Sequence, residues 1–104
     1  MQIYIIVRWG NDASIDGANG EDTIYIIRAP NMAEAIEIAE CELINQPHKR
    51  CEPIANVCIE LGQDVQPGLE PGVIVGPYFN FFHTSDALRS WVRHYSDGEW
   101  EKVR

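Results

Sequence analysis

Three polar residues between two predicted strands have the spacing of the first half of a calcium-binding loop. Asp12, Ser14 and Asp16 alternate and Gly17 follows them, so alternate oxygens can face one centre while the glycine permits the bend. The twelfth position of such a loop requires a bidentate Glu, but Thr23 stands there, and strand patterns rather than helices flank the segment. We therefore predict a solvated acidic loop and no calcium site.

Cysteine and histidine supply the ligands that zinc prefers, and a group of them lies in the middle of the chain. The group comprises Cys41, His48, Cys51 and Cys58, and it contains no pair with the C-x-x-C spacing. Cys41 falls in a predicted helix and Cys58 in a predicted strand, which favours structural thiols over a metal site. We predict neither a metal nor a cofactor.

His83 and His94 are candidates for general-base catalysis, because imidazole titrates near neutral pH. Neither has a sequence-local serine or cysteine nucleophile in a recognisable elbow. We expect His83 to lie at the entry of a helix and His94 to face solvent. The sequence therefore predicts no catalytic residue.

The densest aromatic cluster of the chain occupies residues 78–83. Aromatic and arginine side chains are enriched in binding hot spots, and two arginines follow this cluster. Alternation along a strand lets only one set of the aromatic side chains face the core, so the other set remains accessible. We predict that this region binds a partner or a ligand through Tyr78, Phe79, Phe81, His83, Arg89 and Arg93.

The clearest change of hydrophobic period occurs where a strand pattern over residues 23–28 passes directly into a helix pattern. Pro30 cannot join a strand ladder, and Asn31 can accept a hydrogen bond from the amide of Glu34 at the start of a helix. The spacing predicts a helix over residues 32–45. Its apolar stripe contains Met32, Ala35, Ile36, Ala39 and Leu43.

Acidic residues dominate the outer side of this helix and the chain as a whole. The sequence holds 16 acidic and 8 basic residues, a net charge of −8, which repels nucleic acid and anionic lipid surfaces at long range. We therefore exclude nucleic acid and membranes as partners and predict a protein partner. The acidic surface that would meet it comprises Glu34, Glu37 and Glu40 of the helix with Asp12 and Asp16 of the loop.

Length and cysteine content bound the class of protein. A chain of 104 residues is expected to form one domain. Such a domain can bury about two thirds of its unfolded surface and needs no disulfide or metal ion to fold. Three cysteines cannot all pair, and the start of the chain lacks the pattern of a cleavable leader, which favours a reducing cytoplasm. No apolar run reaches the roughly 20 residues that cross a bilayer.

Further strand patterns complete the expected sheet. Residues 2–9 repeat the apolar pattern of residues 23–28, so these two strands should pair as a hairpin. Alternation of apolar and polar residues predicts a strand over residues 54–61 with one face exposed to solvent. Another strand is predicted over residues 73–76. Pro77 interrupts the latter and indicates a sheet edge, a bulge or a strand end.

Residues 86–95 have the spacing of a second helix, and residues 100–103 suit a short last strand. From residue 23 onward the order is β-α-β-β-α-β. We therefore predict an α+β, ferredoxin-like fold: a split β-α-β antiparallel sheet with an extra N-terminal strand and two helices on one face. A dimer that packs sheet against sheet, or the aromatic segment, would have to cover the other face.

The junction Gly76-Pro77-Tyr78-Phe79, followed by Ser85-Asp86-Ala87, resembles the strand exit and helix start of sporulation-related repeat domains. Those domains are ferredoxin-like and bind peptidoglycan. The resemblance covers only these two short segments, and it implies the ferredoxin-like topology alone.

These observations predict a small, acidic, non-enzymatic protein-interaction domain that neutralises a basic partner such as a toxin. Small acidic immunity proteins are similar to it in size and charge. One alternative is a small-molecule-binding protein or enzyme with a pocket near residues 78–83, where Tyr78, His83 and Arg89 would converge. The other is a structural homodimer that hides the second sheet face.

Overall fold

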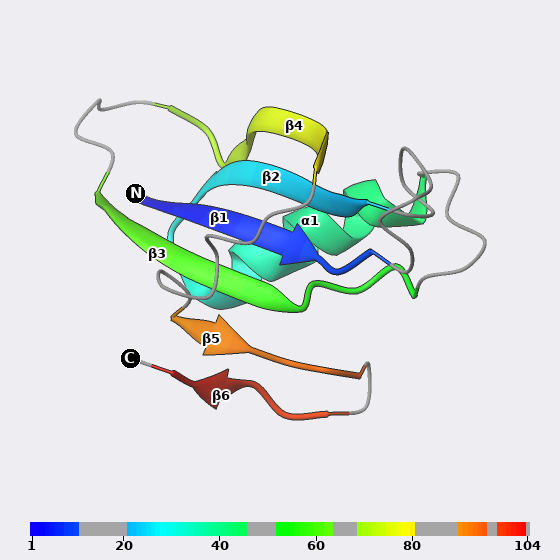
Figure 1. Cartoon of the computed structure of the whole chain (residues 1–104). Coiled ribbons are helices and arrows are strands. Elements are labelled where there is room, and N and C mark those ends of the chain that lie inside the picture. Colours follow the sequence, from blue (N-terminus) through cyan, green and yellow to red (C-terminus); the bar gives the residue numbers. More distant parts are fainter. Residues whose placement is uncertain (11–20, 46–51, 64–68, 81–89, 96–97, 104) are drawn as a thin grey trace.

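The computed structural model of the chain describes residues 1–10, 21–45, 52–63, 69–80, 90–95 and 98–103. Within these ranges one helix accompanies a six-stranded sheet of order β4-β2-β1-β3-β5-β6, in which all neighbouring strands are antiparallel (Figure 1). The elements are β1 (Gln2–Arg8), β2 (Asp22–Ala29), α1 (Met32–Ile44), β3 (Val57–Gln63), β4 (Gly72–Asn80), β5 (Trp91–Val92) and β6 (Glu101–Lys102). No helix in the same ranges has both the length and the apolar character that crossing a bilayer requires.

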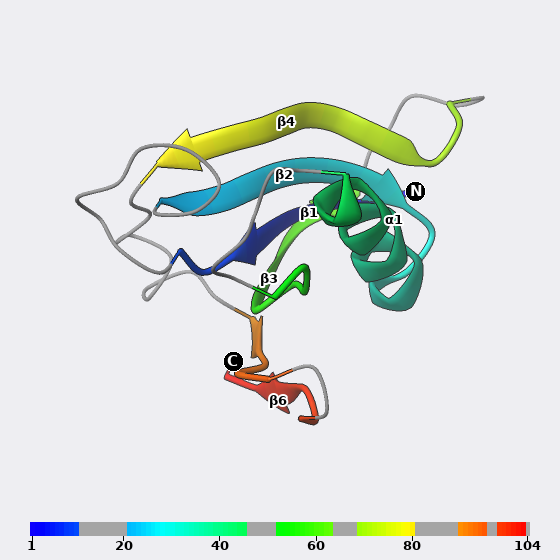
Figure 2. The same cartoon turned by 90° about the vertical axis from the view of Figure 1, so that its right-hand side faces the viewer.

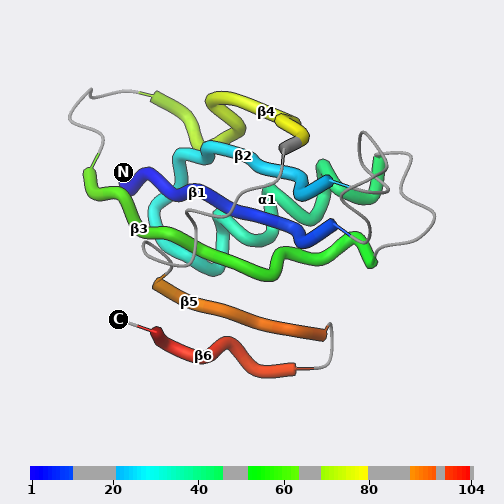
Figure 3. The backbone as a smooth tube through the Cα atoms, in the orientation of Figure 1, coloured from blue at the N-terminus to red at the C-terminus, as the bar shows by residue number. Residues whose placement is uncertain are grey.

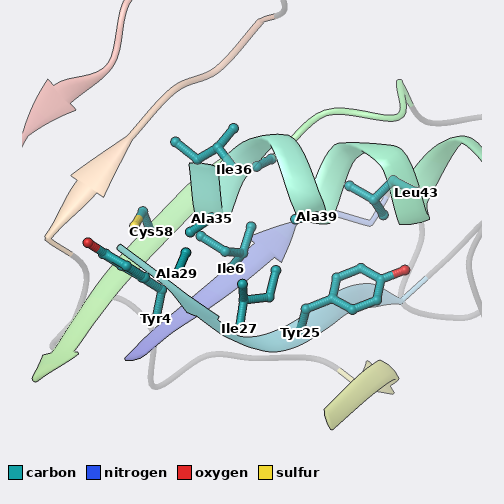
Figure 4. Close-up of a cluster of buried hydrophobic side chains, with 11 residues drawn as sticks. Tyr4, Ile6, Tyr25, Ile27, Ala29, Ala35, Ile36, Ala39, Leu43 and Cys58 are labelled. Atoms are coloured by element: carbon teal, nitrogen blue, oxygen red, sulfur yellow. The ribbon is translucent and has the colours of Figure 1, made fainter. Parts of the chain in front are cut away.

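β1 and β2 both lie inside the sheet, with a strand on either side, because both are rich in β-branched residues, which suit a pleated and buried surface. They pair as the hairpin that the sequence predicts, with Ile5 opposite Ile26. Alternate side chains point toward α1, and there Ile6 and Ile27 are fully buried beside Ala39 of the helix (Figure 4). The buried cluster on this face contains Tyr4, Ile6, Tyr25, Ile27, Ala29, Ala35, Ile36, Ala39, Leu43, Ala55 and Cys58.

α1 lies on one face of the sheet (Figure 2) and begins at the predicted residue. The side-chain oxygen of Asn31 accepts a hydrogen bond of 2.9 Å from the amide of Glu34, which satisfies one of the free amides at the helix start. The stripe predicted to face the core does so. Its fully or nearly buried members are Ala35, Ile36, Ala39 and Leu43, and Met32 is half-buried at the margin.

The predicted ferredoxin-like arrangement, with a split β-α-β sheet and two helices on one face, is wrong. The described structure is mostly sheet, with one helix. β2 and β3 flank β1 and both run antiparallel to it, so the strand between the two that α1 connects is the first of the chain (Figure 3). β4, which a ferredoxin-like sheet would place there, lies at the outer edge beside β2. β1 is apolar on both faces, which fits a central strand rather than an addition. The topology implied by the resemblance to sporulation-related repeat domains is therefore not found.

Of the second helix predicted over residues 86–95, residues 90–95 are described, and they are not helical. Here Trp91 pairs with Cys58 and Val92 with Val57, so β5 extends the sheet beside β3. The helical spacing of the apolar residues is outweighed by main-chain hydrogen bonds to the open edge of β3, which is a tertiary effect that local spacing does not contain. Tyr95, the last residue of the predicted helix, is 67% exposed. The predicted last strand is found as β6.

The sheet face opposite α1 is also apolar. Two rows of cross-strand partners cover it: Tyr78, Ile24, Val7 and Val57 form one, and Val75, Ile26, Ile5 and Ile59 form the other. The β4 ends of these rows are open, with Val75 51% and Tyr78 55% exposed. β4 is an edge strand, which is one of the three alternatives that Pro77 indicates, and it continues through Pro77 to Asn80. The solvent-exposed face predicted for the strand over residues 54–61 is not found at the start of β3, because Val57 and Cys58 are both fully buried.

Candidate functional site

A groove of about 540 Å³ lies between the outer flank of α1 and the chain that enters β4. A helix turns by roughly 100° per residue, so positions three, four, seven and eight apart fall on one side. Pro71, just before β4, forms the opposite wall. The residues that line this acidic groove are Glu34, Glu37, Ile38, Cys41, Glu42 and Pro71.

Three carboxylates give the acidic groove its charge. Glu34, Glu37 and Glu42 are all exposed, whereas Ile38 beside them is half-buried. Exposed carboxylates attract a cationic group from solution, and adjoining apolar atoms gain free energy when a partner removes them from water. The acidic groove therefore combines the two features that a binding surface for a basic protein segment needs.

Glu40, which the sequence analysis groups with Glu34 and Glu37, lies on a different side of the helix. Six residues separate it from Glu34, so the helix turns by roughly 240° between them. Its carboxylate accepts hydrogen bonds from Arg93 Nη2 at 2.5 Å and from the amide of Ala55 at 3.0 Å. The ion pair is partly buried, with Arg93 13% and Glu40 28% exposed. Two residues predicted to meet partners on separate surfaces thus bind each other.

Arg93 makes further contacts within the chain. Its Nε and Nη2 atoms donate to the carbonyl of Ala55 at 3.3 and 3.1 Å, and its guanidinium lies 4.8 Å from the centre of the Trp100 ring. The side-chain amide of Asn56 donates to the carbonyl of Arg93 at 2.9 Å. These contacts hold the guanidinium inside the fold and leave a partner little of it to reach.

Glu42, Ile38 and Pro71 line the acidic groove but are absent from the sequence-based prediction. Glu42 follows Glu34 by eight residues, a spacing that returns it close to the same side of a helix, so the sequence did contain a signal for it. Pro71 had no such signal. Its place beside α1 depends on the path by which the chain enters β4, which only the tertiary structure shows.

The residues predicted to form the aromatic and basic site are not brought together where they are described. Tyr78 lies on the edge strand β4, and Phe79 beside it is half-buried opposite Thr23. Arg93 follows β5, and three strands separate β5 from β4. The remaining predicted site residues, Asp12, Asp16, Phe81, His83 and Arg89, lie outside the described residues.

A second groove, of about 450 Å³, lies on the other flank of α1. It is almost entirely apolar and is lined by Met32, Ala33, Ile36 and Trp100. Neither of these two grooves is lined by Tyr78, beside which the sequence analysis places a ligand pocket.

The two described cysteines differ in chemistry. Cys41 is exposed on α1, and Cys58 is fully buried in β3. Burial, with a smaller effect of the Glu60 carboxylate, raises the pKa of the Cys58 thiol to about 12, so the thiol stays neutral and is a poor nucleophile. Across the described ranges, no group of three or more His, Cys, Asp or Glu side chains is placed to hold a metal ion.

Comparisons with protein-family models, with curated proteins and with solved structures find no match to this chain.

Proposed function

We propose that this chain is a non-enzymatic protein-interaction domain that neutralises a basic partner by binding one of its cationic segments in the acidic groove. The observation that supports this best is the gathering of three exposed carboxylates beside Ile38 and Pro71 in one groove. Lysine and arginine side chains of a partner carry both a charge for the carboxylates and an apolar stem for the adjoining surface.

The charge of the whole chain acts in the same direction. A net charge of −8 attracts a basic protein over distances near the Debye length and raises the rate of encounter. Each solvent-exposed ion pair then contributes only about 0.3–1 kcal/mol. The proposed complex therefore forms quickly, depends strongly on ionic strength and takes its specificity from the shape of the groove.

Calorimetric titration with a short peptide of alternating lysine and leucine tests this proposal. The peptide should bind the wild-type chain at low ionic strength, and binding should weaken steeply as salt is added. The variant Glu34→Gln/Glu37→Gln/Glu42→Gln should bind about tenfold more weakly, because three favourable ion pairs are lost.

The matched control is Glu52→Gln/Glu99→Gln/Glu101→Gln, which changes the net charge equally at exposed positions outside the acidic groove. If binding depends only on net charge, both triple variants lose affinity to the same extent. That result would count against the groove as the binding site, and absence of binding to the wild-type chain would remove the proposal.

The structural homodimer is a second candidate, and the open ends of the apolar rows favour it. Val75 and Tyr78 are exposed, and Ile5 and Ile26 beside them are only half-buried. β4 carries no charged residue over its 9 positions, so two copies can approach there without like-charge repulsion. Light scattering after size exclusion measures the mass directly. A dimer that Val75→Lys converts to a monomer supports this candidate, and a monomeric wild-type chain rejects it.

A further inference from the structure

The described residues 90–95 and 98–103, here called the C-terminal ribbon, are joined to the sheet by little strand pairing. β5 and β6 have 2 residues each, whereas β1 to β4 have 7, 8, 7 and 9. β5 pairs with β3 only at Val57 and Cys58. Regions with few main-chain hydrogen bonds open more readily than the centre of a sheet, so the ribbon needs other contacts to stay closed.

Side chains supply those contacts. Arg93 forms its ion pair with Glu40 on α1 and donates to the carbonyl of Ala55. At the other end of β5, the indole Nε1 of Trp91 donates to Glu60 Oε1 at 2.9 Å, and the amide of Glu60 donates to the Ser90 hydroxyl at 3.1 Å. The Arg93–Glu40 pair is partly buried, unlike the two exposed contacts of Glu60, and it connects the ribbon to the helix.

The ribbon covers one end of the buried cluster. Trp91 and Trp100, both from the ribbon, pack against that cluster, which includes Cys58. Trp91 is also the cross-strand partner of Cys58 on β3. Removing the ribbon therefore takes two indole rings off the cluster and frees the outer edge of β3, whose main-chain groups then lack their strand partner.

We propose that the C-terminal ribbon opens as a unit, as a strap across the end of the core, with the Arg93–Glu40 pair as its latch. Opening exposes Cys58 and the edge of β3 while β1, β2 and α1 stay folded. The exposed edge is then a surface to which another extended segment can add by main-chain hydrogen bonding.

Thiol labelling of Cys58 tests the strap directly. In a Cys41→Ser/Cys51→Ser background Cys58 is the remaining thiol, and a chromogenic aryl disulfide reports its rate of reaction. The proposal predicts that the opening constant measured by labelling is at least about tenfold larger than the one that hydrogen exchange gives for the amide of Ile27 in β2. It also predicts that the labelling rate depends much more weakly on urea than that exchange does, because partial opening exposes less surface. A labelling rate that depends on urea as strongly as global unfolding does would overturn the proposal.

Arg93→Gln tests the latch. Lys102→Gln is its control, because Lys102 is a cation of the same ribbon. It lies 5.9 Å from the centre of the Trp91 ring and is not a member of the Arg93–Glu40 pair. Arg93→Gln should speed Cys58 labelling about tenfold and exchange at Ile27 by a similar factor, because the ion pair is lost both when the ribbon opens and when the whole chain unfolds. The weaker urea dependence of labelling should persist in this variant. Lys102→Gln should change either rate by less than about twofold. Cys58 labelling that Arg93→Gln speeds by less than about twofold contradicts the latch. If Arg93→Gln does not fold, the urea dependence of the wild-type labelling decides.

Discussion

At the scale of single residues, surroundings rather than residue type decide the chemistry. Cys41 and Cys58 carry the same thiol, but Cys41 faces solvent beside three carboxylates while Cys58 lies under α1 and Trp91. The spacing of the cysteines predicts structural thiols, and the burial of Cys58 agrees with this prediction. The partner of Arg93 was beyond the sequence, because Glu40 and Ala55 are remote in the chain and meet it only in the folded structure.

The neutral thiol of Cys58 makes stability depend on alkaline pH. Its folded pKa of about 12 lies above the ordinary value of 9.0, so the unfolded chain loses this proton first. The resulting stability is fully present below about pH 9 and is lost as the pH rises toward about 12. In that window the free energy of unfolding from urea titrations should fall about 1.4 kcal/mol per pH unit more steeply for the wild type than for Cys58→Ala. Equal slopes would contradict this assignment.

Gly76 lies on β4 against Ile24 and Tyr25 of β2. Its φ of +130° is one that side chains rarely adopt, and a Cβ there would lie 2.6 Å from Tyr25 Cδ1 and 2.8 Å from the carbonyl oxygen of Ile24. Gly76→Ala should lower the free energy of unfolding by roughly 2–4 kcal/mol. Gly72→Ala is the matched control, because no atom lies within 4 Å of its Cβ, and it should change stability by less than about 1 kcal/mol. Similar urea midpoints for the two variants would refute the close approach.

At the scale of elements, the sequence correctly predicts those in which several local signals indicate the same structure. α1 has a cap, an apolar stripe and a defined start, and residues 32–44 follow all three. β1 and β2 were predicted because both are long and β-branched. Trp91 and Val92 belong to a run of residues with helical spacing, but they form a strand because the open edge of β3 offers them main-chain partners. Competition of this kind depends on an edge that local spacing does not reveal.

The start of α1 depends on Asn31. Removing its side-chain acceptor leaves the Glu34 amide without its cap, so Asn31→Ala should lower the free energy of unfolding by about 1 kcal/mol. Asn31→Ser retains an acceptor and should recover most of this loss. Thermal and urea unfolding of both variants measure the difference. An Asn31→Ser variant as unstable as Asn31→Ala would show that the cap is not what this residue contributes.

At the scale of the whole molecule, charge and apolar surface are segregated. The acidic groove lies on the outer flank of α1, and the open apolar rows lie on the opposite face of the sheet. The acidic helix surface was predictable from the sequence, but Glu40 does not belong to it, because an i, i+3, i+6 series drifts around a helix. The segregation allows one face to bind a basic partner without obstructing the other.

Resonance mapping tests the acidic groove most directly. Amide nitrogen–proton spectra should be followed while the alternating lysine–leucine peptide is added at low ionic strength. The account predicts that the largest shift changes fall on Glu34, Glu37, Ile38, Cys41 and Glu42, and that they disappear at high salt. Changes centred on Val75 and Tyr78, or none anywhere in the described residues, would contradict it.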